Sequence, residues 1–125
     1  MRQLGRDMSE HREQTKLFEE LKKLAATYPV VELAFSIPNA AKRSFSVACY
    51  MKREGLKSGV PDLFLPVARN GYHGLFIEMK SKLGKLTEQQ CAWLFALQKQ
   101  GYLAIVCRSA NEALRNILAY LEIGD

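Results

Sequence analysis

Three charged residues lie within two short apolar segments of this chain. Asp62 precedes Leu63-Phe64-Leu65, whereas Glu78 and Lys80 end the segment that begins at Leu75. Burying an unpaired charge costs several kcal/mol, so charged side chains in such segments are normally paired or bound to a metal ion. Two adjacent carboxylates repel each other, and a hard divalent cation such as Mg²⁺ or Mn²⁺ relieves that repulsion. With a lysine beside it, such a metal site has the groups needed to hydrolyse a phosphodiester bond.

The two segments are expected to pair as a β-hairpin formed by Asp62–Val67 and Tyr72–Lys80. Successive side chains of a strand point to opposite faces, so Glu78 and Lys80 share one face of the second strand. Directly opposed residues of an antiparallel pair lie on the same side, so the charges converge if Asp62 is paired with Glu78. The pairing register therefore decides whether a site forms.

The turn between the strands is compatible with two registers. An odd-length loop centred near Asn70 pairs Asp62 with the glutamate. A two-residue type I′ turn at Asn70-Gly71, which this dipeptide prefers, shifts the pairing by one residue and turns Asp62 to the other face. We expect the register that forms the site, and hence a longer loop or a bulge near Pro66 or Gly74 instead of a tight Asn-Gly hairpin.

A purely structural interpretation of the same residues stays open at this point. Asp62 would then cap the entrance of its strand after Pro61, and Glu78 and Lys80 would form a salt bridge on a half-exposed face. An isolated Glu-x-Lys sequence is more often of this structural kind. The surrounding sequence must decide between the two interpretations.

Helical and strand patterns alternate along the chain. Apolar residues recur every three or four positions near the start, for instance at Leu17, Leu21 and Leu24, as in an amphipathic helix. Runs of β-branched and aromatic residues that end at turn residues indicate strands. The apolar face of the last helix is expected to form either core, the more common outcome, or a subunit interface; its residues are Leu114, Ile117, Leu118 and Leu121. We expect an α/β fold of order αβαββαβα, with elements at residues 9–27, 30–37, 40–54, 62–67, 72–80, 87–100, 102–107 and 109–121.

Composition and charge narrow the class of protein. The 125 residues, 48% of them hydrophobic, fit one globular domain spanning residues 1–125. The net charge of +5 is compatible with a polyanionic partner. No apolar run approaches the roughly 18 residues that span a bilayer, and the N-terminus does not resemble a signal peptide, so we expect a cytoplasmic protein. Cys49, Cys91 and Cys107 are widely spaced among apolar neighbours, which favours reduced core thiols over disulfides or a zinc site.

The charged residues also belong to a longer pattern. Pro61-Asp62 followed by Glu78-Met79-Lys80 resembles the PD-(D/E)xK signature of metal-dependent nucleases. The wider sequence, from Ser9-Glu10 through Lys52–Leu63 to Leu86–Gln90, resembles the VRR-NUC branch of these nucleases, especially its small stand-alone phage and bacterial members. This resemblance implies a restriction-endonuclease-like core, in which helices flank a mixed central sheet.

The resemblance also implies roles for the residues that match the signature. Asp62 and Glu78 are expected to bind the metal ion, Mg²⁺ or Mn²⁺, with the backbone carbonyl of Met79 as a further ligand. Lys80 is expected to be the catalytic lysine. The expected reaction is metal-dependent hydrolysis of DNA in the cytoplasm of a bacterium or of a phage-infected host.

Two further residues match positions of the family, but each also has a structural interpretation. Glu10 fits the spacing of a metal-binding, catalytic acid in the first helix better than Glu13 does, although acids are favoured in a first helical turn in any case. Gln90 matches an active-site glutamine and shares a helical face with Trp93. However, Thr87 and Gln90 also have the spacing of a capping box, which would occupy the glutamine side chain locally.

Basic residues flank the expected site and are expected to contact DNA phosphates, which position a duplex without reading its sequence. They are Lys42, Arg43, Lys52, Arg53, Lys57, Lys82 and Lys85. No helix-turn-helix or zinc-finger motif accompanies them. We therefore expect selectivity for branched DNA, such as a Holliday junction, and a homodimer that supplies two active sites. The alternatives are a non-catalytic DNA-binding module with the same fold and, less favoured, a sequence-specific restriction-type endonuclease.

Overall fold

The computed structural model describes residues 2–39 and 44–123, and the side chains from residue 8 onward within these ranges. Its helices and strands follow the predicted order αβαββαβα, with an additional 3₁₀ turn before the first strand. The elements are α1 (Arg2–Leu24), η1 (Pro29–Leu33), β1 (Phe35–Ser36), α2 (Phe45–Arg53), β2 (Leu63–Leu65), β3 (Leu75–Met79), α3 (Glu88–Lys99), β4 (Leu103–Cys107) and α4 (Ala110–Tyr120). None of the described helices is long and apolar enough to cross a membrane.

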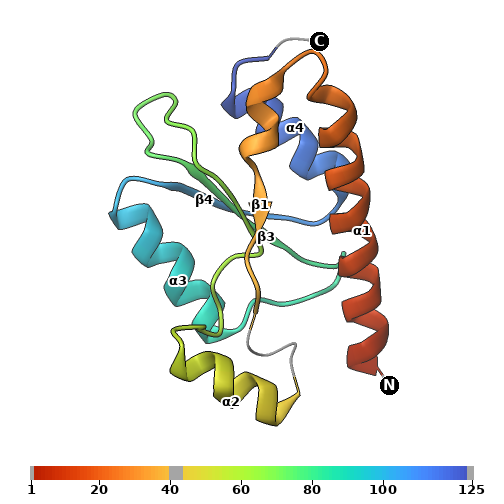
Figure 1. Cartoon of the computed structure of the whole chain (residues 1–125), viewed down its shortest axis with the longest axis vertical. Coiled ribbons are helices and arrows are strands. Elements are labelled where there is room, and N and C mark those ends of the chain that lie inside the picture. Colours follow the sequence, from red (N-terminus) through yellow and green to blue (C-terminus); the bar gives the residue numbers. More distant parts are fainter. Residues whose placement is uncertain (1, 40–43, 124–125) are drawn as a thin grey trace.

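Four strands form one mixed sheet with helices on both faces (Figure 1). The strand order is β1-β2-β3-β4, with antiparallel pairing up to β3 and parallel pairing of β3 with β4. Helices α1 and α4 pack on each other and on one face, where Leu17, Ile77 and Ile117 are fully buried. Helix α3 connects β3 to β4 and packs against β4. This α/β arrangement is the restriction-endonuclease-like core that the sequence predicted. The other face of β2 and β3 carries the stacked rings of Phe64 and Phe76, next to Glu78.

The β2–β3 hairpin has the register that brings the charged residues together. Phe64 is paired with Phe76, so the same register places Asp62 opposite Glu78. A slip by one residue would turn the whole apolar set of the other face towards solvent, which is why this register is preferred. That buried set is Leu63, Leu65, Leu75, Ile77 and Met79.

The tip of the hairpin is nevertheless a tight Asn-Gly turn, so that part of the prediction was wrong. Asn70 and Gly71 have φ angles of 51° and 83°. Arg69 and Tyr72 exchange backbone hydrogen bonds of 3.2 and 2.8 Å across the turn. Positive φ at both central residues is the geometry of a type I′ turn, which asparagine and glycine adopt at little cost.

A bulge reconciles this tight turn with the register of the strands. Between the turn and the paired strands, the first strand contains the three residues 66–68, whereas the second contains the two residues 73–74. The extra residue lies where the bulge was predicted, next to Pro66. Tyr120 of α4 donates a hydrogen bond of 2.6 Å to the carbonyl of Val67 and so holds the bulge against the core.

The strand predicted at residues 30–37 is mostly a 3₁₀ turn. Pro29 begins η1, where its fixed φ is favourable and its missing N–H costs nothing. The turn places Val31, which is 1% exposed, in the core next to α1. Only Phe35–Ser36 remains to pair with β2. The β-branched residues of this segment indicated a strand wrongly, because their side chains are favoured by burial in the core and not only by an extended backbone.

Two helix starts also differ from the prediction. Helix α1 begins at Arg2 and not near residue 9. Helix α2, predicted over residues 40–54, begins at Phe45, because the hydroxyl of Ser44 accepts a hydrogen bond of 3.4 Å from the N–H of Val47 as an N-cap. Residues 40–43 lie outside the described residues. Helix α2 buries none of its residues.

The three cysteines are free thiols, as predicted, but only one belongs to the core. Burial and the nearby carboxylate of Glu112 raise the pKa of Cys107 to about 12, so this thiol stays protonated at neutral pH. Cys49 and Cys91 are exposed on α2 and α3. The prediction that all three are core thiols was therefore wrong for these two, because their sides of the helices face solvent.

Candidate nuclease site

The candidate site lies where β2 begins and β3 ends. Asp62 and Glu78 face each other across the two strands, on the side away from α1 and α4, and are 4% and 2% exposed. The Oδ2 atom of Asp62 accepts a hydrogen bond of 2.7 Å from the backbone N–H of Met79. Because this bond reaches across to β3, the aspartate does not cap its own strand. Opposed residues have Cβ atoms about 5 Å apart, which allows both carboxylates to bind one cation.

A glycine allows the segment before Asp62 to pack against the start of α3. Gly59 has a φ of 90°, and a Cβ atom at this position would lie 2.8 Å from the Cβ atom of Gln89. A side chain there would strain the backbone and push the segment away from α3. Pro61, which is fully buried, then leads the chain into β2. The glycine therefore brings the aspartate-bearing segment to the first turn of α3.

Gln90 connects this first turn to Glu78. Its Nε2 atom donates a hydrogen bond of 3.2 Å to Oε2 of Glu78, and its Oε1 atom accepts one of 2.9 Å from the N–H of Thr87. The N–H of Gln90 in turn donates to the hydroxyl of Thr87 at 3.1 Å, which completes a capping box. The capping box is therefore present, and it leaves the Nε2 end of the amide available to Glu78, because each end of the amide has its own partner. The active-site role of Gln90 stays a prediction.

Two variants separate these contributions to stability. Thr87→Ala removes the cap alone and is expected to lower the free energy of unfolding by about 1 kcal/mol. Gln90→Ala keeps the hydrogen bond to the Thr87 hydroxyl, because its donor is the backbone N–H, but removes the acceptor for the N–H of Thr87 and the donor to a buried carboxylate, so we expect a loss of about 2 to 3 kcal/mol. Urea unfolding measures both values. Equal losses would contradict a stabilising contact between Gln90 and Glu78.

The two acids of α1 that the sequence left as alternatives have different partners. Oε2 of Glu10 accepts a hydrogen bond of 3.2 Å from the N–H of Ser81, the residue after Lys80. Oε1 of Glu13 accepts one of 2.8 Å from the N–H of Ala110, the first residue of α4. A carboxylate at that position interacts favourably with the helix dipole. Glu13 therefore caps α4, and Glu10 is the acid next to the end of β3.

Lys80 directly follows β3 and is half-buried. Its backbone N–H donates a hydrogen bond of 2.9 Å to the carbonyl of Cys107, which continues the pairing with β4. Its stem runs beside Gly84, since a Cβ atom on that glycine would lie 3.5 Å from Cδ of Lys80. The same Cβ atom would lie 2.8 Å from the hydroxyl oxygen of Ser81. Glycine therefore lets the loop after Lys80 fold back closely on itself.

Arg108 is a residue of this region that the sequence analysis missed. It follows β4 directly, and its Nη1 atom donates hydrogen bonds of 2.9 and 2.7 Å to the carbonyls of Ser81 and Gly84. A longer contact of 3.5 Å reaches the carbonyl of Lys82. In the sequence, Arg108 is marked only as a single arginine directly after an apolar strand. Its place near Lys80 can be predicted once β4 is known to lie parallel to β3, because parallel strands end at the same edge of a sheet.

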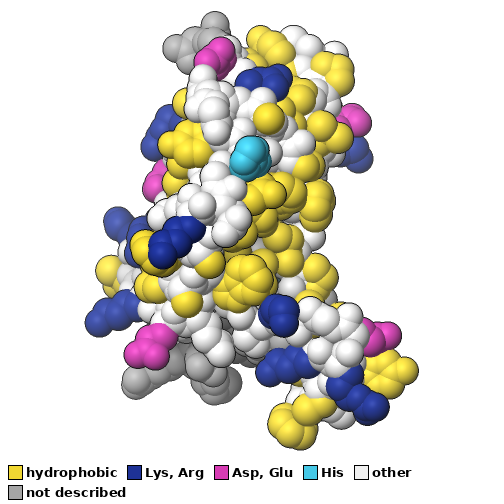
Figure 2. Space-filling view, turned by 90° about the vertical axis from the view of Figure 1, so that its left-hand side faces the viewer, with side chains coloured by type: hydrophobic (Ala, Val, Ile, Leu, Met, Phe, Trp, Pro, Cys, Tyr) yellow, Lys and Arg dark blue, Asp and Glu magenta, His cyan; other side chains and the backbone are white. Residues whose placement is uncertain are grey.

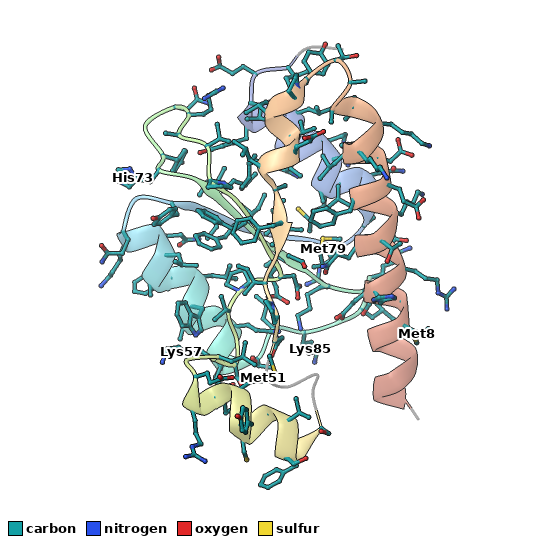
Figure 3. All side chains as sticks on the ribbon, viewed as in Figure 1. Met8, Met51, Lys57, His73, Met79 and Lys85 are labelled. Atoms are coloured by element: carbon teal, nitrogen blue, oxygen red, sulfur yellow. The ribbon has the colours of Figure 1, made fainter. Side chains whose placement is uncertain are left out.

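Five of the seven basic residues expected to contact DNA are described, and all five are exposed. They are Lys52 and Arg53 in the last turn of α2, Lys57 after it, and Lys82 and Lys85 in the loop after Lys80. Lys42 and Arg43 lie outside the described residues. Figure 2 shows several Lys and Arg side chains at the lower right of the view and others along the left edge and near the top. Figure 3 shows Lys57 and Lys85 in the lower half of the view, below Met79.

The donors that meet at this site suit a hard divalent cation. Asp62 and Glu78 supply carboxylate oxygens, which with backbone carbonyls and water are the ligands that Mg²⁺ and Mn²⁺ prefer. The carbonyl of Met79 as a further ligand stays a prediction. Among the described side chains, those of residues 8–39 and 44–123, no three His, Cys, Asp or Glu residues are grouped closely enough to hold a metal ion. The expected role of Glu10 as a further ligand therefore stays a prediction.

Comparisons with known proteins agree with this geometry. The sequence model of the VRR-NUC domain matches residues 7–111. A solved structure described as a VRR_NUC domain protein superposes with a TM-score of 0.64 at 28% sequence identity, covering 86% of this chain and 89% of the other. The chain is also 41% identical over 54 residues to the Fanconi-associated nuclease 1 homolog of Arabidopsis thaliana. That match covers 41% of this chain and 6% of the relative, so the chain spans a small part of the relative's length.

Proposed function

Because the chain belongs to the VRR-NUC domain family, we propose that it is a metal-dependent DNA endonuclease, with one nuclease domain over residues 1–125. One observation carries this proposal: two buried carboxylates, Asp62 and Glu78, oppose each other on adjacent strands, and Lys80 follows on the second strand. The similarity to a protein named as a nuclease supports the same activity. Divalent-metal chemistry is also typical of nucleases of this type.

Mg²⁺ or Mn²⁺ is the proposed cofactor. Asp62 and Glu78 would hold the ion, with the carbonyl of Met79 and the carboxylate of Glu10 as further proposed ligands. When bound, the ion supplies Lewis acidity towards a phosphoryl oxygen and makes a water molecule more acidic. The two carboxylates are oriented before the ion binds, because the N–H of Met79 and the amide of Gln90 each hold one of them.

Two side chains are proposed to act on the substrate or on the ligands. Lys80 would orient the attacking water and offset the negative charge that develops on the phosphate in the transition state. Gln90 would keep Oε2 of Glu78 in place by donating to it. The half-buried stem of Lys80 limits the positions of its ammonium group, which favours such a role over loose binding of phosphate.

The basic residues around the site are proposed to contact DNA phosphates. If Lys82 and Lys85 each neutralise one phosphate, replacing both by alanine lowers the slope of log K against log salt concentration by about 2. A matched control is Lys22→Ala/Lys23→Ala, which removes the same charge from the last turn of α1 at the other end of the molecule (Figure 1). Fluorescence anisotropy between about 50 and 200 mM NaCl measures both slopes. An equal change in the two double variants would contradict local phosphate contacts.

We further propose that the substrate is branched DNA, such as a Holliday junction, and that the protein acts as a homodimer. Symmetric cleavage of a four-way junction requires two sites related by a two-fold axis. Helix α2 exposes Phe45 by 86% and Tyr50 by 67%, and such an apolar surface is suited to a second copy of the chain. The proposal includes a cytoplasmic location in a bacterial or phage-infected cell, which the three free cysteines support.

A panel of labelled DNA substrates tests this proposal. Four-way junction, flap, duplex and single-stranded DNA are incubated with the protein and Mg²⁺ or Mn²⁺ at equal concentrations. We expect the branched substrates to be cut at least about tenfold faster than duplex, which corresponds to about 1.4 kcal/mol of discrimination. Equal rates on all substrates would contradict structure selectivity but not nuclease activity. Light scattering coupled to gel filtration tests the homodimer independently.

A further inference from the structure

The loop after Lys80 is held by an arginine from the neighbouring strand end. The Nη1 atom of Arg108 carries two hydrogens, and two carbonyls accept from it at 2.9 and 2.7 Å, those of Ser81 and Gly84. The carbonyl of Lys82 lies farther away, at 3.5 Å. One guanidinium group therefore holds both ends of the loop 81–84.

The other backbone groups on either side of Lys80 are also held. The N–H of Lys80 donates to the carbonyl of Cys107 at 2.9 Å, and the N–H of Ser81 donates to Oε2 of Glu10 at 3.2 Å. Arg108 then holds the carbonyl of Ser81. Three separate elements, α1, β4 and the residue after β4, thus converge on the backbone that carries the lysine.

An arginine suits this position better than other cationic side chains do. Its guanidinium is planar, always charged and rigid, so it can bring together several carbonyl oxygens that would otherwise repel each other. A lysine offers a flexible point charge without this fixed geometry. Gly84 is also needed for this loop conformation, because the residue is buried and a side chain at its position would collide with the hydroxyl of Ser81. The loop conformation therefore depends on both the glycine and the arginine.

We propose that Arg108 is a positioning residue for Lys80 and for the phosphate-binding loop that begins at Ser81. This inference rests on the proposed nuclease function. Arg108 acts on Lys80 through the loop, because the two hydrogens of its Nη1 atom are accepted by the loop carbonyls of Ser81 and Gly84. A catalytic group displaced by about 1 Å loses on the order of 100-fold in rate. Ordering of this loop is therefore expected to affect the cleavage step more than DNA affinity.

Limited proteolysis tests the loop order without reference to activity. A protease that cuts after lysine can attack Lys82 in the native protein only if the loop opens. In Arg108→Ala we expect cleavage at Lys82 to be at least about tenfold faster than in the wild type. The matched control is Arg115→Ala, which removes an exposed arginine from α4 and should leave the loop protected. Similar protection in both variants would overturn the proposal.

Single-turnover cleavage of a labelled four-way junction tests the consequence for catalysis. We expect Arg108→Ala to slow the step at saturating protein by about 10- to 100-fold, as is usual for residues that orient catalytic groups. DNA affinity should stay within about threefold of the wild type. Arg108→Lys keeps the charge and should show the same direction of effect, so the test does not depend on one variant. Added guanidinium should restore part of the rate of Arg108→Ala, whereas equal NaCl should not.

The outcomes separate this inference from the proposed function. A loss of affinity in proportion to the rate would overturn positioning and identify Arg108 as a direct phosphate contact. If wild-type protein cuts no DNA, the proposed function fails and the catalytic part of the inference is overturned with it, while proteolysis still decides whether Arg108 orders the loop. If the wild type is active and Arg108→Ala is equally fast, only the inference fails.

Discussion

Lys80→Ala is expected to give a folded protein that binds DNA but cuts it about 100- to 10,000-fold more slowly, the range typical for the loss of a group that acts in proton transfer or charge stabilisation. The backbone hydrogen bond from residue 80 to Cys107 persists in this variant, so β3 and β4 should remain paired. Only the ammonium group and the stem beside Gly84 are lost. Single-turnover rates on a labelled four-way junction measure the catalytic effect, and anisotropy measures the affinity.

Lys85→Ala is the matched control for this prediction. It removes the same charge from an exposed residue of the adjoining loop. We expect it to weaken DNA binding and to leave the rate at saturating protein within about threefold of the wild type, since it removes a contact made equally in the ground state and the transition state. Lys80→Ala activity within about tenfold of the wild type, or equal effects of the two variants, would show that Lys80 only binds phosphate.

Glu78→Gln is expected to abolish metal-dependent cleavage while making the metal-free protein more stable. The glutamine keeps an oxygen that can accept from Gln90, so the hydrogen bond of 3.2 Å can persist. The negative charge is lost, however, and with it the repulsion between two buried carboxylates. We expect a gain of about 1 kcal/mol in the free energy of unfolding without metal, or about 4 °C in melting temperature.

Thermal melting with and without Mg²⁺ measures both effects of Glu78→Gln. A ligand that binds the folded state raises its stability by mass action, so the wild type should gain stability with Mg²⁺ and the variant should not. Glu88→Gln, which removes an exposed carboxylate from the first turn of α3, is the matched control and should respond to Mg²⁺ like the wild type. Equal stabilisation of all three proteins would contradict a metal site at Glu78.

The sequence predicted which residues of the hairpin strands lie on the same face of the sheet. Alternation over the two hairpin strands left two registers open, and the pairing of Phe64 with Phe76 was chosen because it brings the charged residues together. The structure has this pairing, and a slip by one residue would expose the apolar core face. The turn at Asn70-Gly71 was predicted wrongly because turn and strands were treated as one register. The structure separates them by a bulge that depends on a hydrogen bond from Tyr120, a residue 53 positions after Val67. Contacts of this range cannot be read from local sequence.

In the candidate site too, the sequence indicated the residues of the two hairpin strands but not the contacts between residues far apart in the chain. Asp62, Glu78 and Lys80 were identified from type and spacing, and the structure brings the first two together. The choice between Glu10 and Glu13 needed the packing of α1 on the strand ends, which shows one acid at Ser81 and the other at Ala110. The partners of Arg108 lie between 24 and 27 residues earlier in the chain, so only the parallel pairing of β3 with β4 connects them.

The metal dependence of wild-type cleavage tests the central claim most directly. A four-way junction labelled at one 5′ end is incubated with the wild-type protein in Mg²⁺, in Mn²⁺ and in EDTA, with Lys80→Ala alongside. The proposed site predicts defined cuts with either metal, no product in EDTA, and none above background with the variant. Intact DNA under both metals, despite measurable binding to the junction, would contradict the claim and leave a DNA-binding module that retains the nuclease fold.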